Sequence, residues 1–247
     1  MITRITTLLA SALLLAVSST APSTAAAQVR AGVDASAIVP EGYSLVSVTA
    51  PDELALPVRV VIAPDARPSE RVLVHVRVLE SEAAARAFFA DRAEWRTSHS
   101  AMPRTDVGEV AWGTAATGAS GMVAFARDNV VVEVLITGED AQCDAMPIAL
   151  HVDRAIAAAP VGSTRSELAA PVPQLSREVG SSARITMPAG AIAMDVRVSG
   201  DAVARRVGDA WLVSVTGEGA WEVSVAIVDA HLRSANASVR WAEGIRR

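Results

Sequence analysis

Four histidines are the side chains of this sequence best suited to acid–base catalysis or metal binding. They are His75, His99, His151 and His231. None lies at the His-Glu-x-x-His or His-x-His spacing that brings two imidazoles onto one zinc ion. Asp229 and His231 could place two ligands on one face of a strand, but the segment favours a surface turn. The histidine spacing therefore predicts no metal site.

Nucleophilic chemistry has little support in the sequence. The stretch Gly118-Ala-Ser120-Gly121 superficially resembles the Gly-x-Ser-x-Gly elbow of serine hydrolases. Its spacing is different and it falls between predicted strands, so we interpret it as a loop. The chain has no lysine, since all 22 basic residues are arginine. Schiff-base, phosphate-loop and Ser-Lys mechanisms are therefore excluded.

Acidic residues gather before a predicted helix, at Glu139-Asp140 and at Asp144. They could form a weak cation site, although helix capping explains Asp144 more simply. No glycine-rich turn joins a strand to a helix in the way that phosphate and dinucleotide sites require. We therefore predict no catalytic, cofactor-binding or metal-binding residues, and no cofactor.

Cys143 is the only cysteine, so the chain has no intramolecular disulfide and too few thiols for a structural zinc site. Its acidic neighbours, Asp140 and Asp144, should raise the pKa of the thiol rather than activate it. We interpret Cys143 as a small buried residue at a helix start, with intermolecular pairing as the alternative.

The elements that must position these residues begin with strands. In residues 71–79 valines alternate with His75 and Arg77, which is typical of a half-buried strand with both polar residues on one face. Further strands are expected at the segments 45–48, 58–63, 109–112, 122–127 and 130–136. Ser81 and Asp144 should cap two helices, reaching to about residues 96 and 159. The order of elements predicts an α+β fold, an antiparallel sheet with two helices covering one face.

The second half of the chain shows short strands only, with no long helix between them. Residues 161–178 are rich in proline, serine and alanine, as expected for a linker. Six segments of about six residues follow, separated by glycine-containing turns, which predicts a small all-β sandwich. Its tryptophans, Trp211, Trp221 and Trp241, are expected partly in the core.

The run Ala210-Trp-Leu-Val-Ser-Val-Thr-Gly-Glu-Gly-Ala-Trp-Glu-Val-Ser-Val resembles the late strands of bacterial immunoglobulin-like domains, in which a Thr-Gly-x-Gly turn joins two alternating strands. This resemblance covers under a third of the chain and implies a stalk, spacer or adhesive module without chemistry. The element order of the first half is similar to that of secreted α+β modules of the PsbP family, an analogy at the level of fold alone.

The first 27 residues have the features of a secretory signal. Arg4 precedes an apolar run of about ten residues, and Ala25-Ala26-Ala27 offers a cleavage site. The remaining sequence is divided into an α+β domain (28–160), a linker (161–178) and an immunoglobulin-like β-sandwich (179–247). We expect no transmembrane segment after cleavage. The formal net charge of −5 argues against nucleic-acid binding.

These observations predict an exported protein, in the periplasm, at the cell surface or in the medium. We expect it to be a non-enzymatic binding, scaffolding or adhesion protein of the envelope, whose partner is an unknown protein or envelope component. One alternative is a hydrolase with an unrecognised site in the N-terminal domain, near His75, Arg77 and the loop 112–121. Another is an assembly or regulatory partner of an envelope complex.

Overall fold

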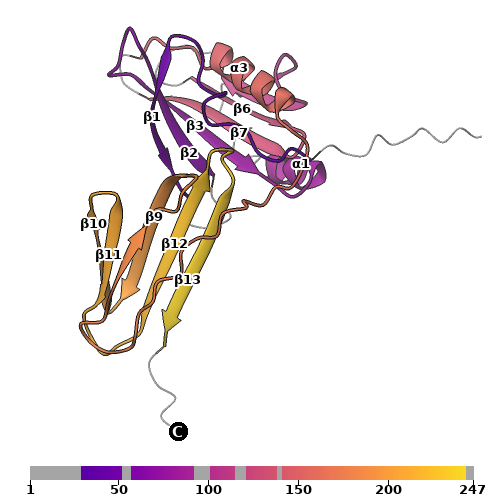
Figure 1. The fold of residues 1–247 in the computed structure, drawn as a ribbon. Helices are drawn as coiled ribbons and strands as arrows, with labels where there is room; N and C mark the ends of the chain where they lie inside the picture. Colours follow the sequence, from indigo (N-terminus) through magenta and orange to yellow (C-terminus); the bar gives the residue numbers. More distant parts are fainter. Residues whose placement is uncertain (1–28, 52–56, 92–100, 115–120, 138–140, 243–247) are drawn as a thin grey trace, which may run out of the picture.

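The computed structural model describes residues 29–51, 57–91, 101–114, 121–137 and 141–242. The predicted signal segment 1–27 lies outside these residues, as do His99, Ser120 and Glu139-Asp140. No helix among the described residues is long and apolar enough to cross a membrane. The chain forms two units, joined end to end (Figure 1).

A seven-stranded antiparallel sheet forms the first unit. Its strands are β1 (Tyr43–Thr49), β2 (Val58–Pro64), β3 (Arg71–Val78), β4 (Ala101–Arg104), β5 (Val110–Thr114), β6 (Met122–Arg127) and β7 (Val130–Thr137). They lie in the order β1-β2-β3-β7-β6-β5-β4. The tight β6–β7 turn has Asp128 at φ +50°, in agreement with the hairpin that the residue pair Asp128-Asn129 predicts.

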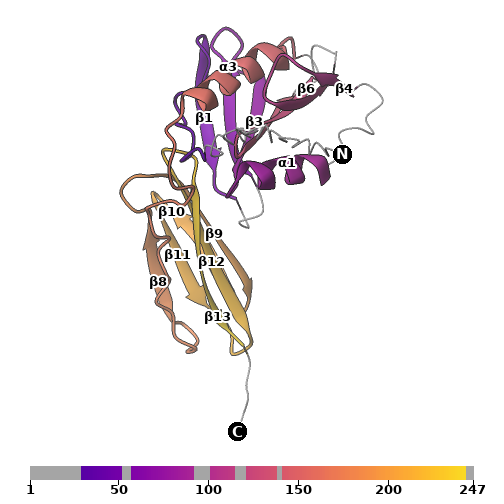
Figure 2. The same cartoon turned by 90° about the vertical axis from the view of Figure 1, so that its right-hand side faces the viewer.

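Two helices pack on opposite faces of this sheet (Figure 2). Helix α3 (Ala145–Ala158) joins the core that contains Val132 and Val134, whereas α1 (Glu82–Asp91) packs against Val131. Successive side chains of a strand point to opposite faces, so the two helices must lie on different sides of β7. Both predicted caps are present: the Ala84 amide donates to Ser81 Oγ at 3.1 Å, and the Met146 amide donates to Asp144 Oδ1 at 3.0 Å.

The second unit consists of two three-stranded antiparallel sheets. Its strands are β8 (Ser182–Thr186), β9 (Ala191–Gly200), β10 (Ala202–Val207), β11 (Ala210–Val215), β12 (Trp221–Asp229) and β13 (Ser234–Trp241). One sheet has the order β10-β11-β8 and the other β13-β12-β9, and a shared apolar core joins them. Trp221 is buried in this core, while Trp211 and Trp241 are half-buried. Gly200 has φ +69° where the chain passes between the sheets, and a Cβ there would lie 1.9 Å from the Ala220 carbonyl oxygen.

The predicted fold class is wrong. The described residues are mostly β, with 47% of them in strands and 13% in helices, so the fold is not an antiparallel sheet covered by two helices followed by a small immunoglobulin-like sandwich. The helices do not cover one face, because one lies on each side of the sheet and both contact mainly β6 and β7. The second unit has three strands in each sheet, whereas an immunoglobulin sandwich needs at least seven strands.

The sequence contained a sign of the two-sided packing. In β7 the residues Val130–Val134 are all buried, which gives a continuous run in place of alternation. A strand buried on both faces has such a continuous apolar sequence, so the run indicated that both sides of the sheet are covered.

The sequence analysis did not predict strand β4, because it is short and contains Pro103, which is unusual within a sheet.

Apolar residues of the second unit complete the core of the first. Val228 of β12 and Leu232 of the β12–β13 turn are buried in the same cluster as β2, β3 and α3. The amide of Val33 also donates to the His231 carbonyl at 2.8 Å. The segment 161–178, predicted as a linker, packs on the second core through Leu168, Ala170 and Leu175.

Candidate functional site

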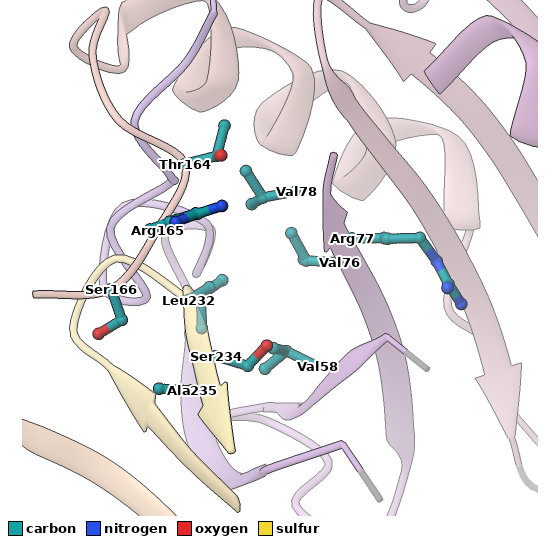
Figure 3. Close-up of a pocket in the computed structure, with 10 residues that line it drawn as sticks. All are labelled: Val58, Val76, Arg77, Val78, Thr164, Arg165, Ser166, Leu232, Ser234 and Ala235. Atoms are coloured by element: carbon teal, nitrogen blue, oxygen red, sulfur yellow. The ribbon is translucent and has the colours of Figure 1, made fainter. Parts of the chain in front are cut away.

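A cleft at the joint between the two units is the candidate site. It has a volume of about 450 Å³ and is open to solvent on one side. Its residues come from three places in the sequence: the start of β2 with the end of β3, the segment 164–166, and the β12–β13 hairpin. Figure 3 shows these segments facing one another. Clefts between packed units are a common location of ligand sites.

The floor of the cleft is apolar. Val58 and Val76 are cross-strand neighbours in β2 and β3, and both are buried. Val78 continues the same face of β3, and Leu232 closes the floor from the hairpin. Arg77 stands between Val76 and Val78 in β3, but its side chain points away from the cleft (Figure 3). Its Cζ atom lies 4.1 Å from the centroid of the Phe88 ring. Strand alternation therefore leaves only apolar side chains on the floor.

The rim of the cleft is polar. Thr164 and Ser234 present hydroxyl groups, and the side chain of Arg165 points toward Val76 and Val78 (Figure 3). The Ser166 hydroxyl points away and donates to Asp229 Oδ2 at 2.9 Å. No carboxylate, thiol or imidazole is among the described residues that line this cleft. The cleft is therefore equipped to bind a molecule and lacks groups for acid–base or nucleophilic chemistry.

Asp229 holds the hairpin in the conformation that shapes the cleft. Its Oδ1 atom accepts from the amides of His231 and Arg233 at 2.9 and 3.0 Å, and its Oδ2 atom accepts from Arg233 Nε at 2.8 Å. These bonds place Leu232 at φ +56°, an uncommon value for a leucine. The turn predicted at Asp229 and His231 is therefore present, and Asp229 is buried in it as a structural acceptor. This role could have been suspected from the Asx-turn preference of aspartate.

His75, which the hydrolase alternative places near its site, forms an acid–base pair with Glu133. His75 Nδ1 lies 3.1 Å from Glu133 Oε2, and the two residues are register neighbours in β3 and β7. Their side chains are 18% and 8% exposed, so the pair is largely shielded from solvent. His75 Nε2 is buried and has no hydrogen-bond partner among the described residues. Sequence reasoning missed Glu133, although a lone carboxylate in an apolar strand was a signal.

This pair lies on the face of the sheet opposite the cleft floor, because His75 alternates with Val74 and Val76. Among the described residues, no serine, threonine or cysteine side chain is hydrogen-bonded to His75. The structure therefore places His75 and Arg77 on one face, as expected, and does not join them to a described nucleophile.

No family model, curated protein or solved structure matches this chain. The geometry of the site is therefore the basis for assigning it a function.

The other described histidines do not line the cleft. His151 lies on α3 with Nε2 at 2.9 Å from the Ala37 carbonyl oxygen, and His231 is exposed in the hairpin turn. Within the described ranges, no three metal-ligating side chains come together.

Cys143 lies in a polar cluster at the start of α3. Its thiol donates to Glu70 Oε2 at 2.8 Å, and Glu70 also pairs with Arg67 Nε at 2.8 Å. Burial, and then the hydrogen bond to Glu70, raises the pKa of the Cys143 thiol. The predicted direction of this shift is confirmed, and the carboxylate that the structure places at the thiol comes from Glu70 in the β2–β3 turn. Asp140 lies outside the described residues. The cluster ties the helix start to the sheet.

Tyr43, the only tyrosine, reports on this cluster and allows a spectroscopic prediction. Burial, followed by the nearby Cys143 thiol, raises its pKa from the ordinary value of 10.0 to about 12. The unfolded chain loses the phenol proton at lower pH, so the stability contributed by this group is present below pH 10 and is lost as the pH rises toward 12. Absorbance at 295 nm should show the phenol still protonated at pH 11 in the folded chain, and ionised at that pH in urea. Ionisation near pH 10 in the folded chain would contradict the prediction.

Proposed function

We propose that this chain is an exported, non-enzymatic binding protein that holds a small ligand in the cleft between its two units. The observation that carries the proposal is the composition of the cleft, an apolar floor with a polar rim. Small-molecule sites commonly combine apolar walls with a few polar groups that orient the ligand. Export rests on the features of residues 1–27 and is part of the proposal.

The location of the cleft supports binding over catalysis. The groups with catalytic potential, His75 and Glu133, are on the other face of the sheet. A hydrolase needs its base within hydrogen-bond reach of a nucleophile or a water at the substrate. The residues facing the cleft instead provide hydroxyl groups and one guanidinium, which recognise a ligand without transforming it.

Blocking the cleft tests this proposal. The probe is N-phenyl-1-naphthylamine, a neutral apolar dye whose fluorescence rises in an apolar site. The intact chain should bind it saturably, and Thr164→Trp should weaken binding at least tenfold, because the indole would fill the space above the valine floor. Thr164 belongs to an irregular segment and is half-buried, so the substitution leaves the sheets unchanged.

Thr186→Trp is the matched control, because Thr186 is exposed at the end of β8 and does not line the cleft. It adds the same side chain and should leave the dye affinity unchanged. The proposal fails if the intact chain shows no saturable binding, or if both tryptophan variants bind the dye as the unaltered chain does.

A further inference from the structure

The cleft has one charged side chain at its mouth, and that charge is uncompensated. Arg165 is exposed and makes no ion pair with any acidic side chain among the described residues. Its guanidinium is directed over the cleft toward Val76 and Val78 (Figure 3). A guanidinium at the open end of an apolar cleft is suited to a carboxylate or phosphate group.

The backbone around Arg165 is held in place on both sides. Its amide donates to Ser163 Oγ at 3.2 Å, and Ser166 Oγ accepts from the Leu168 amide at 3.2 Å while donating to Asp229. The segment is thus fixed to the hairpin that provides Leu232. The backbone of Arg165 is therefore held beside the cleft, so that only the side chain must be ordered when it binds an anion.

The other charges at the joint are already satisfied or directed elsewhere. Arg233 and Asp229 form an ion pair at 2.8 Å, and their side chains are largely buried. Arg77 stacks on Phe88 on the far side of the sheet. Arg165 is therefore the charged side chain that a molecule in the cleft would meet first, and it favours a ligand of opposite sign.

From this geometry we infer that the ligand is a small amphipathic anion. Its apolar body would lie on Val58, Val76 and Leu232, and its carboxylate or phosphate head would bind Arg165, with the Thr164 and Ser234 hydroxyls as additional hydrogen-bond donors. This inference rests on the proposed function, since it names the ligand class of the same cleft. The volume of about 450 Å³ falls within the usual range for a small-molecule site.

Matched ligands that differ only in the head group test the inference. Decanoate, decyl phosphate and 1-decanol are titrated against the chain loaded with N-phenyl-1-naphthylamine, and the concentration that displaces the dye is measured. At least one of the two anions should displace the dye at about fivefold lower concentration than decanol does. This difference in affinity is typical of a partly exposed pair of opposite charges. The difference between decanoate and decyl phosphate shows which head group is preferred, and added salt should reduce the advantage of both.

Arg165→Gln should remove this advantage while leaving decanol displacement unchanged. Arg154→Gln, which removes an exposed arginine from α3, is the control and should change neither. The inference is overturned if decanol binds as tightly as both anions, or if Arg165→Gln weakens decanol equally. In those cases the loss of dye binding in Thr164→Trp still supports a neutral-ligand cleft. Absence of any saturable dye binding would instead remove the proposed function itself.

Discussion

Replacing Leu232 by alanine should lower the free energy of unfolding by about 3 kcal/mol, the middle of the range for a leucine removed from a packed core. Leu232 belongs to the hairpin turn of the second unit, yet it is only 1% exposed and lies in the core of the first. The shortened side chain would leave a cavity between the two units. Because Leu232 comes from the hairpin of the second unit and packs in the core of the first, we expect the two units to lose stability together.

Urea unfolding provides the measurement for Leu232→Ala. Tryptophan fluorescence, to which Trp112 of the first unit and Trp221 of the second both contribute, should show a single transition shifted to lower urea. His231→Ala is the control, because His231 is the exposed neighbour in the same turn, and its free-energy change should stay within about 0.5 kcal/mol. Equal effects of the two substitutions would show that Leu232 does not act as a core residue.

Replacing Asp229 by asparagine should cost a similar amount, about 3 kcal/mol, for an electrostatic reason. The side chains of Asp229 and Arg233 are 6% and 11% exposed, so removal of the carboxylate leaves a largely buried guanidinium without its partner. An asparagine could keep Oδ1 toward the two backbone amides. Its Nδ2 would then face two donors, the Ser166 hydroxyl and Arg233 Nε, in place of an acceptor.

The matched control for Asp229→Asn is Glu222→Gln in the same sheet. Glu222 and Arg240 form a pair at 3.4 Å whose side chains are 36% and 75% exposed, so its loss should cost no more than about 0.5 kcal/mol. Thermal unfolding of both variants, followed by circular dichroism, separates the two cases. A loss of stability in Asp229→Asn no larger than in Glu222→Gln would contradict the structural role of this carboxylate.

Local features of the fold were readable in the sequence. Alternation identified β3, and the capping residues Ser81 and Asp144 marked the starts of α1 and α3. Each of these features depends on residues within a few positions of one another, for which periodicity and hydrogen-bonding preferences are informative. The predicted arrangement of the helices on one face was wrong, because alternation within a strand does not say which helix covers which face.

The candidate site was not readable in the same way. Its floor joins Val58 and Val76 to Leu232, residues that are far apart in the chain and are ordinary core residues when considered singly. Arg165 stands in a segment whose composition predicts only a linker. The same holds for His75, whose partner Glu133 is 58 positions away.

By itself, the sequence determined which chemistries lack their residues. The absence of lysine and the single cysteine exclude whole classes of mechanism, and the patterns of valine and of capping residues specify most of the strands and helix starts. The tertiary structure alone decided which helix lies on which face, that Leu232 of the β12–β13 turn is buried in the first unit, and that the cleft forms beside it. The physical reason is that short-range preferences act between neighbours in the chain, whereas burial is decided by contacts between segments that folding brings together.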